Sequence, residues 1–306
     1  MKISKKGFKN LIIYILLRIL LGFINLLPLK EAYLFAGALA KSAYYIFPSD
    51  RRTALSNLRI AFENRSRPDL KSIYKQSLKN IGYSAVDVLR FKKFNRGEIM
   101  KMVEVVGLEN FDKAYNRGRG IVAVTGHISN FELIAAWFGQ AGYKTAAVGR
   151  QLYDIRLNRM LIKNRERMNV LCIDSEAPVS RFMRTLRQGY AIGVLVDQDS
   201  SRYRGEFVEF FGKPAYTPIG PILLARMAKA AVVPIVIIRK KPMRYSMIIF
   251  PELTFDYESD RNEDVKRVLT KVTEILENTI KENPEHWVWM HKRWKTKPKD
   301  IEEYIK

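Results

Sequence analysis

The chain is poor in the residues that form disulfides and hold metals. Its 306 residues include one cysteine, Cys172, and three histidines, so no internal disulfide can form and no Cys/His pair has the spacing of a zinc site. The sequence also lacks a G-x-G-x-x-G or phosphate-loop motif, which nucleotide-binding domains carry. We therefore expect no metal and no bound cofactor. Cys172 lies in an apolar run and is predicted to be a small buried hydrophobe, with a catalytic thiol as the alternative.

Acidic residues are scarce relative to basic ones. Lys plus Arg number 53 against 31 Asp plus Glu, which gives a formal net charge of +22. Such a surface attracts polyanions, whether nucleic acid, anionic lipid headgroups or an acidic protein partner. Hydrophobic residues make up 47% of the chain, which is too few for a multi-span transporter. We expect one globular domain, residues 31–306, behind a membrane-associated segment, residues 1–30.

This N-terminal segment is basic and then apolar. Residues 1–10 carry four lysines and no acid, and residues 11–29 are almost continuously apolar. A helix over 11–29 is about 28 Å long, close to the hydrocarbon thickness of a bilayer. Polar residues nevertheless recur along one stripe of it: Tyr14, Arg18, Gly22 and Asn25. Because a charge at the centre of a lone spanning helix costs about 2.5–3.5 kcal/mol, we favour an interfacial or re-entrant helix over a spanning anchor.

The rest of the chain changes texture near residue 100. Residues 31–100 are predicted to be mainly helical, with helices over 30–47, 51–62 and one or two over 66–91. In residues 101–306, short β-branched runs alternate with stretches long enough for helices. Strands are expected at 121–124, 145–148, 170–173, 192–196, 232–238 and 245–250, and helices at 131–142, 156–168, 178–187, 218–230 and 265–280. This alternation predicts an α/β fold, a largely parallel sheet flanked by helices.

The segment Gly126-His127-Ile128-Ser129-Asn130-Phe131-Glu132 is the strongest candidate for chemistry. His127 follows the expected strand 121–124, at the sheet edge where substrates bind in such folds. Ser129 and Glu132 have the spacing of a capping box that starts a helix, from which Glu132 could reach back to the imidazole. Neutral imidazole can take a hydroxyl proton, and a carboxylate on its other nitrogen fixes its tautomer. Alternatively, Glu132 only caps the helix and His127 is an ordinary turn residue.

Several further stretches form, together with this motif, an ordered set along the chain. They are a basic-aromatic segment at 51–62, Gly149-Arg150 after a strand, Asp197-Gln198-Asp199 after another, Phe-Phe-Gly-Lys-Pro-Ala-Tyr-Thr at 210–217, Val233-Pro234, and a tryptophan-basic block at 284–295. The H-x-x-x-x-E motif resembles the glycerolipid acyltransferase superfamily. The ordered set covers nearly the whole chain. It resembles one family of that superfamily, the lipid A late acyltransferases, which are lauroyl and myristoyl transferases.

The resemblance implies O-acyl transfer with His127 as general base. The donor would be an acyl thioester on acyl carrier protein, a co-substrate and not a cofactor, whose acidity suits the basic surface. The acceptor would be a lipid A precursor, while phosphatidylinositol mannoside and lysoglycerolipids remain open. It also implies the bacterial inner membrane, with the catalytic domain on the cytoplasmic face and no nucleic acid as partner. The alternative is a non-catalytic, membrane-anchored basic protein that binds anionic lipid or nucleic acid; such a protein does not need the His127–Glu132 turn.

Four polar residues near the expected strand ends are candidates for substrate binding. Arg150 could bind an acceptor phosphate or stabilise the oxyanion, or be a surface arginine. Asp197 and Asp199 could orient Arg150 or Arg202, and a structural ion pair is at least as plausible for them. Gln198 between them is ambiguous.

Two aromatic-rich stretches complete the candidates. Phe211 and Thr217 belong to the Gly/Pro-containing turn 210–217, predicted either to shape an acyl tunnel wall with exposed aromatics or to be a packed loop. The tryptophans of the 284–295 block suit an interfacial belt, or alternate residues from 287 to 290 form an edge strand.

Overall fold

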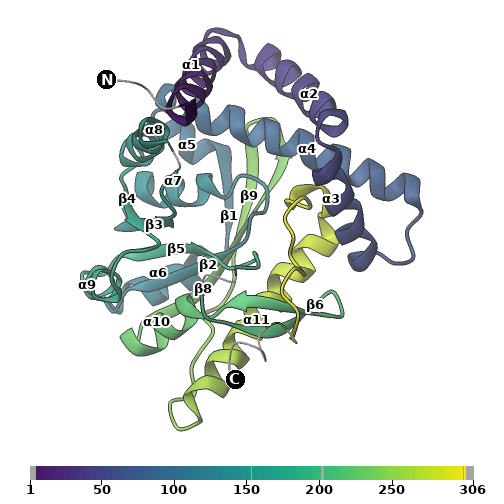
Figure 1. The fold of residues 1–306 in the computed structure, drawn as a ribbon. Helices are drawn as coiled ribbons and strands as arrows, with labels where there is room; N and C mark the ends of the chain where they lie inside the picture. The colour runs from purple at the N-terminus through teal and green to yellow at the C-terminus, as the bar shows by residue number, and fades with distance from the viewer. Residues whose placement is uncertain (1–4, 153, 201–202, 299, 301–306) are drawn as a thin grey trace.

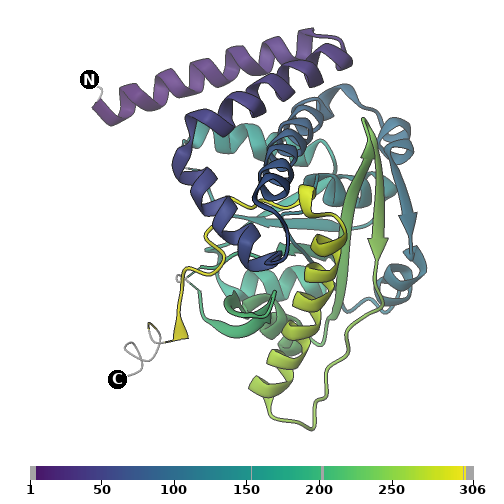
Figure 2. The ribbon, with the colours of Figure 1, turned by 90° about the vertical axis from the view of Figure 1, so that its right-hand side faces the viewer.

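The computed structural model describes residues 5–152, 154–200, 203–298 and 300. Its N-terminal part is helical, as predicted, and consists of α1 (Lys5–Leu26), α2 (Leu29–Ile46), α3 (Pro48–Ala61) and α4 (Arg67–Leu89). The stretch 66–91 forms a single helix, α4, followed by the short turn η1 (Phe91–Lys93). Figures 1 and 2 show α1 and α2 as a pair at one end of the molecule, with α4 between this pair and the sheet.

Helices α1 and α2 expose many apolar side chains. The large hydrophobic residues exposed on them are Ile12, Ile13, Ile15, Leu16, Leu17, Ile19, Phe23, Leu26, Leu34, Leu39, Tyr45 and Ile46. Among the described residues, no helix combines the length and the apolarity needed to cross a membrane. The C-terminal end of α1 is fixed to the domain, because Arg90 Nη1 donates hydrogen bonds to the carbonyl oxygens of Ile24 and Leu27 at 3.0 and 2.8 Å.

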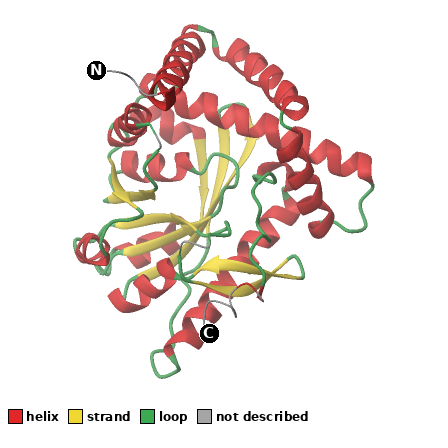
Figure 3. Cartoon of the chain, viewed as in Figure 1, coloured by secondary structure: helices red, strands yellow, loops and turns green. Residues whose placement is uncertain are grey.

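A seven-stranded sheet forms the centre, in the order β1-β9-β8-β2-β5-β3-β4. Its strands are β1 (Val103–Val106), β2 (Ile121–Thr125), β3 (Thr145–Gly149), β4 (Val170–Asp174), β5 (Ala191–Leu195), β8 (Ala231–Lys241) and β9 (Arg244–Ile249). Every pairing is parallel except β8 with β9, which form an antiparallel hairpin. The predicted largely parallel sheet is therefore confirmed. Figure 3 shows its strands, in yellow, surrounded by helices.

Helices cover both faces of this sheet. They are α5 (Arg96–Met102), α6 (Leu108–Tyr115), α7 (Glu132–Ala141), α8 (Ile155–Glu166), α9 (Val179–Arg187), α10 (Gly220–Ala228) and α11 (Arg261–Glu282). Along β2, Ile121 and Ala123 pack in the core with α5, α6 and α7, while Val122 and Val124 pack in the opposite core with α10 and α11. Burial on both faces explains why this strand is a continuous apolar run.

Two strand elements go beyond the sequence prediction. The short strand β1 adds an edge beside β9. The segment read as a turn, 210–217, instead belongs to a separate antiparallel hairpin of β6 (Gly205–Phe210) and β7 (Lys213–Pro218). Its tip places Phe211 at a φ of 52°, followed by Gly212 at 67°, a left-handed pair that closes the two strands.

A buried ionic cluster connects the N-terminal helices to the sheet. Asp87 of α4 accepts a hydrogen bond from Arg239 Nη2 of β8 at 2.8 Å, and the hydroxyls of Tyr33 and Tyr245 donate to the same carboxylate. The main-chain N–H of Arg239 donates to Ser129 Oγ at 3.1 Å. The helical layer is thus bonded to the turn that follows β2.

Residues 284–297, which follow α11 and are called here the C-terminal strap, cross back over the helical layer. Polar side chains of α3 and α4 bind its main-chain carbonyls: Asn57 binds those of Trp289 and His291, Ser77 that of Trp287, and Asn80 that of Glu285. Trp287, Trp289 and Trp294 are all buried, so the prediction of an interfacial tryptophan belt is wrong. The edge-strand alternative is also wrong, since the only β-type contact here within the described residues is one isolated bridge between Trp287 and Ile128.

Candidate active site

His127 lies at the carboxyl edge of the sheet, as predicted. Strand β2 ends at Thr125, which pairs with Leu195 of the neighbouring parallel strand β5. His127 and Asp197 each lie two residues beyond that pair, so the two side chains emerge together. His127 Nδ1 lies 2.8 Å from Asp197 Oδ1, and the His127 main-chain N–H donates to Asp197 Oδ2 at 2.7 Å. Gly126 permits this approach, because a Cβ there would lie 3.0 Å from Asp197 Oδ2.

Glu132 lies in the first turn of α7 and binds a different partner from the one predicted. Its two carboxylate oxygens accept from Arg165 Nε and Nη2 of α8, at 3.0 and 2.6 Å. The expected capping box is also absent from this described segment, since α7 has Phe131 as N-cap without a side-chain cap, and Ser129 adopts a φ of 51°. The carboxylate that orients the imidazole is therefore Asp197, because the parallel register brings it to the ring while Glu132 turns toward α8.

Each member of the His127–Asp197 pair stabilises the charged form of the other. Burial alone would raise the pKa of Asp197, but the charge of His127 and hydrogen bonds from His127 and Trp287 lower it to about 2. Burial alone would lower the pKa of His127, but the charge of Asp197 and the hydrogen bond to it raise it above the usual 6.5. The His127 side chain is 25% exposed. With Asp197 ionised, Nδ1 carries the proton and Nε2 is the basic nitrogen.

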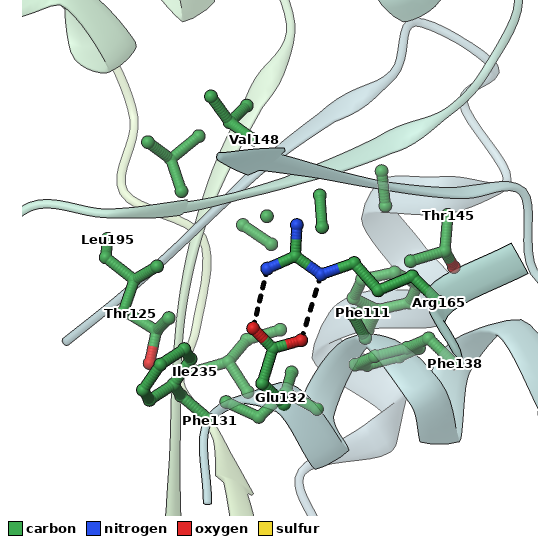
Figure 4. Close-up of a pocket in the computed structure, with 17 residues that line it drawn as sticks. Phe111, Thr125, Phe131, Glu132, Phe138, Thr145, Val148, Arg165, Leu195 and Ile235 are labelled. Carbon is green, nitrogen blue, oxygen red and sulfur yellow. Dashed lines mark hydrogen bonds and ion pairs between the residues drawn. The ribbon is translucent and has the colours of Figure 1, made fainter. Parts of the chain in front are cut away.

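A narrow apolar pocket with a cavity volume of about 50 Å³ lies between the sheet and α7. It is linked to the turn that carries His127 through Phe131, which lines the pocket and packs its ring 5.1 Å from that of His127. Figure 4 shows the Glu132–Arg165 ion pair among its apolar walls. The other walls come from α6, α7 and the strands β2, β3, β5 and β8, and include Phe111, Phe138, Thr145, Val148 and Leu195.

The other polar candidates do not converge as expected. Arg150 is exposed just after β3. Asp199 accepts hydrogen bonds from the main-chain N–H and the hydroxyl of Thr296 at 2.7 and 2.8 Å, and so holds the strap; with Asp197 bound to His127, neither aspartate orients Arg150. Gln198 is half-buried between them. Arg202 lies outside the described residues.

Phe211 and Thr217 are packed residues of the hairpin. The Phe211 ring packs on Phe62 and Trp289, with centroids 5.9 and 6.3 Å apart. Thr217 Oγ1 accepts from Arg293 Nη2 at 2.6 Å, and both residues are buried. The packed-loop alternative therefore describes them, and neither lines the pocket of Figure 4.

Three residues that bind His127, Glu132 or Asp197 in the structure are not given these roles by the sequence analysis. Asp197 is expected from the sequence either to orient an arginine or to form a structural ion pair, and the structure instead pairs it with His127. The usable signal is its place directly after a strand of a parallel sheet. Arg165 and Trp287 carry no local signal, because their partners lie 33 and 90 residues away along the chain. Within the described part of the chain, no group of three or more His, Cys, Asp or Glu side chains could hold a metal. Cys172 is half-buried on β4.

The fold, with a carboxylate-bound histidine beside an apolar pocket, is that of an α/β acyltransferase. The chain belongs to the bacterial lipid A biosynthesis acyltransferase family, whose model matches residues 1–296, so the resemblance seen in its motifs is confirmed and it is an O-acyltransferase.

Similarity to individual proteins supports the same family. The chain is 25% identical over 254 residues to the lipid A biosynthesis palmitoleoyltransferase of Escherichia coli K12, covering 80% of this chain and 78% of the relative. It is 26% identical over 278 residues to that organism's lipid A biosynthesis myristoyltransferase, covering 88% and 81%. To the phosphatidylinositol mannoside acyltransferase of Mycobacterium tuberculosis H37Rv it is 27% identical over 164 residues, covering 52% of each chain.

Proposed function

We propose that this enzyme transfers a fatty acyl group from a thioester on acyl carrier protein to a hydroxyl of a lipid A precursor or a related glycolipid, with His127 as general base. The observation that carries the proposal is the contact of His127 Nδ1 with Asp197 Oδ1 at 2.8 Å. It leaves Nε2 as the basic nitrogen, on a ring that is partly exposed at the carboxyl edge of the sheet.

The chemistry follows from this pair. Nε2 of His127 takes the proton of the acceptor hydroxyl as its oxygen attacks the thioester carbonyl, and Asp197 stabilises the imidazolium that forms. The tetrahedral oxyanion collapses, the C–S bond breaks, and the leaving thiolate takes the proton from His127. The products are an ester and a free thiol, and the histidine is again neutral. No covalent acyl-enzyme intermediate is needed, because the acceptor oxygen is itself the nucleophile.

The pocket beside Phe131 is the proposed place for the acyl chain. Its walls are mostly apolar, and Phe131, one of its lining residues, packs against the ring of His127. A chain that entered the pocket past Phe131 would keep its carbonyl carbon on the side of His127. Burial of each methylene of the acyl chain contributes about 0.8 kcal/mol to the free energy of binding. The Glu132–Arg165 ion pair joins α7 to α8 beside the pocket and so helps to hold the pocket wall in place.

Helices α1 and α2 are proposed to lie in the cytoplasmic interface of the bacterial inner membrane. Their exposed apolar residues supply the buried surface that interfacial helices need. Basic residues lie on or beside these helices: Arg18 is exposed on α1, and the guanidinium of Arg156 on α8, which also binds Asp154, lies 4.4 Å from the ring of Tyr14 on α1. Anionic headgroups would attract such residues, and the same net charge of +22 suits an acidic carrier protein.

The acceptor is proposed to carry phosphate, because Arg150 is exposed at the end of β3, on the same sheet edge as His127. A guanidinium can bind a phosphate through two hydrogen bonds. Relatives named for lipid A support a phosphorylated glucosamine lipid, and the relative named for phosphatidylinositol mannoside supports testing other glycolipids as well.

The test is transfer of labelled acyl groups from acyl carrier protein to a bacterial lipid extract. His127→Asn is the first variant, since its amide can still donate to Asp197 while it provides no base. Transfer should fall about 10²-fold or more, and the labelled product identifies the acceptor. Asp260→Asn, an exposed carboxylate that caps α11, is the control and should retain activity. Unchanged transfer by His127→Asn, or none by the wild type at any acyl length, would contradict the proposal.

A further inference from the structure

Asp197 has one donor outside the catalytic turn. The indole Nε1 of Trp287, on the C-terminal strap, donates to Asp197 Oδ2 at 2.7 Å. The same oxygen accepts from the main-chain N–H of His127, while Oδ1 lies against Nδ1 of the ring. Trp287 and Asp197 are both buried. The carboxylate that orients the imidazole therefore shares its charge among three N–H groups, one of which comes from a segment 90 residues away.

The indole is held in place from several directions. The carbonyl of Trp287 accepts from Ser77 Oγ of α4 at 2.6 Å, and its backbone forms the isolated bridge with Ile128. Its ring packs edge-on against Trp289 and Phe210, with centroids 4.7 and 5.6 Å apart. A donor locked by packing and main-chain bonds is preorganised, so it loses little conformational freedom when it binds the carboxylate.

We propose that Trp287 is a positioning residue of the acyl transfer, which fixes the Asp197 carboxylate and, by drawing charge from it, limits how strongly His127 holds its proton. This inference rests on the proposed function. Without the Trp287 N–H, the Asp197 carboxylate has one hydrogen-bond donor fewer and interacts more strongly with the His127 imidazole. It then stabilises the protonated ring more strongly, so that more of the base is occupied by a proton at a given pH.

Among the described residues, other charged or titratable groups also act on the pair, and none of them is altered by a substitution of the indole. Asp197 and Glu132 both favour the protonated form of His127. His291 of the strap is close enough for its own pKa to be influenced by Asp197 and His127, and Asp197 in turn acts on Arg293. A substitution that removes only the indole N–H therefore isolates its effect on His127.

The decisive variant replaces Trp287 by β-(3-benzothienyl)alanine, which keeps the bicyclic shape and exchanges N–H for sulfur. Trp287→Phe is the simpler companion. Trp289→Phe is the matched control, because Trp289 is equally buried on the same strap but donates its Nε1 to the carbonyl of Pro284 at 2.6 Å. The full-length protein is used throughout. The chain has three histidines, so the His127 imidazole can be followed by NMR and assigned with His127→Asn.

The pKa of His127, and with it the acid limb of kcat/KM, should rise by about half a pH unit in both variants at position 287. That corresponds to a loss of about threefold in kcat/KM below the limb, while KM for the acyl donor stays unchanged. Trp289→Phe should titrate like the wild type. An unchanged or lower pKa of His127 in the benzothienylalanine variant, or an equal rise in Trp289→Phe, would overturn the proposal.

The two readouts separate this inference from the proposed function. NMR titration of His127 needs no turnover, so it decides the role of the indole even if no donor and acceptor pair is processed. If the wild type transfers acyl groups but the position-287 variants titrate normally, the function stands and the role of Trp287 fails.

Discussion

Arg165 binds Glu132 through two parallel hydrogen bonds, with Nε and Nη2 at 3.0 and 2.6 Å from its carboxylate oxygens. The two side chains are 13% and 17% exposed, so most of the pair is shielded from water beside the apolar pocket (Figure 4). The bond joins α7, whose first turn follows His127, to α8. Removing one partner leaves the other as a largely desolvated charge.

Glu132→Ala should therefore lower the free energy of unfolding by about 3 kcal/mol. The double variant Glu132→Leu with Arg165→Met should recover much of that loss, because it removes both charges and keeps the volume. Chemical denaturation of the two variants and the wild type measures this. If Glu132→Ala keeps its stability but loses transfer activity, Glu132 acts in the chemistry and not in holding the helices.

Asp197→Asn should lower kcat about 10³-fold or more, with little change in KM. A neutral amide does not stabilise the imidazolium, and it can hold the ring in the wrong tautomer. Asp199→Asn is the control from the same loop, since Asp199 binds Thr296 of the strap, and it should cost less than tenfold in kcat. Equal losses in the two variants would mean that the loop, and not the carboxylate at position 197, is what matters.

The His127–Asp197 pair should make stability depend on pH in two windows. The folded pKa of His127 is raised above 6.5, so its contribution to the free energy of unfolding is complete below pH 6.5 and is lost as the pH rises through the folded pKa. The pKa of Asp197 falls from 3.8 to about 2 on folding, so its contribution is complete above pH 3.8 and is lost as the pH falls toward 2.

Denaturation of wild type and His127→Asn between pH 5.5 and 9 checks the upper window. The difference between their free energies of unfolding should be largest at pH 5.5 and shrink as the pH rises. A difference that grows with pH would mean that the folded protein prefers neutral His127.

Thr217→Val should destabilise the protein without affecting substrate binding. Valine keeps the shape but removes the oxygen that accepts from Arg293 Nη2 at 2.6 Å. Burial lowers the pKa of Arg293 to about 10, so the guanidinium stays charged at neutral pH and loses a partner, at a cost of about 1–3 kcal/mol. Thermal unfolding and KM for both substrates are the measurements; a raised KM at unchanged stability would return Thr217 to the substrate site.

Substituting Leu16 and Ile19 together by serine should weaken binding to anionic vesicles about tenfold or more. Both are exposed on α1, and each apolar side chain contributes about 1.5–3 kcal/mol when it leaves water. Vesicle co-sedimentation measures the binding. Val179→Ser, an exposed apolar residue on α9, is the control and should bind as the wild type does. Unchanged binding by the α1 variant would place the membrane contact elsewhere.

Local pattern was enough to predict β2 and the place of His127, because a strand buried on both faces is an apolar run and its end is visible in the sequence. It was not enough to choose between Glu132 and Asp197. Glu132 has the attractive local spacing, whereas Asp197 is 70 residues from His127 and becomes its partner only through the order of strands in the sheet.

The burial of Trp287 was unpredictable for a related reason. A run of tryptophans and basic residues looks the same at a membrane interface as in a packed segment, and the difference is made by the donors that bind its backbone. Those donors, Asn57, Ser77 and Asn80, lie more than 200 residues earlier on α3 and α4. The hairpin is not predicted because Gly212 and Pro214 both indicate a turn. Gly212 does lie at the tip, but Pro214 lies on β7.

The docking of the C-terminal strap also orders events during synthesis. When β2 and β5 have left the ribosome, His127 and Asp197 can already meet, but the indole of Trp287 is still to be translated. The nascent chain therefore lacks one of the three N–H groups that bind the Asp197 carboxylate until the strap emerges and settles onto α3 and α4.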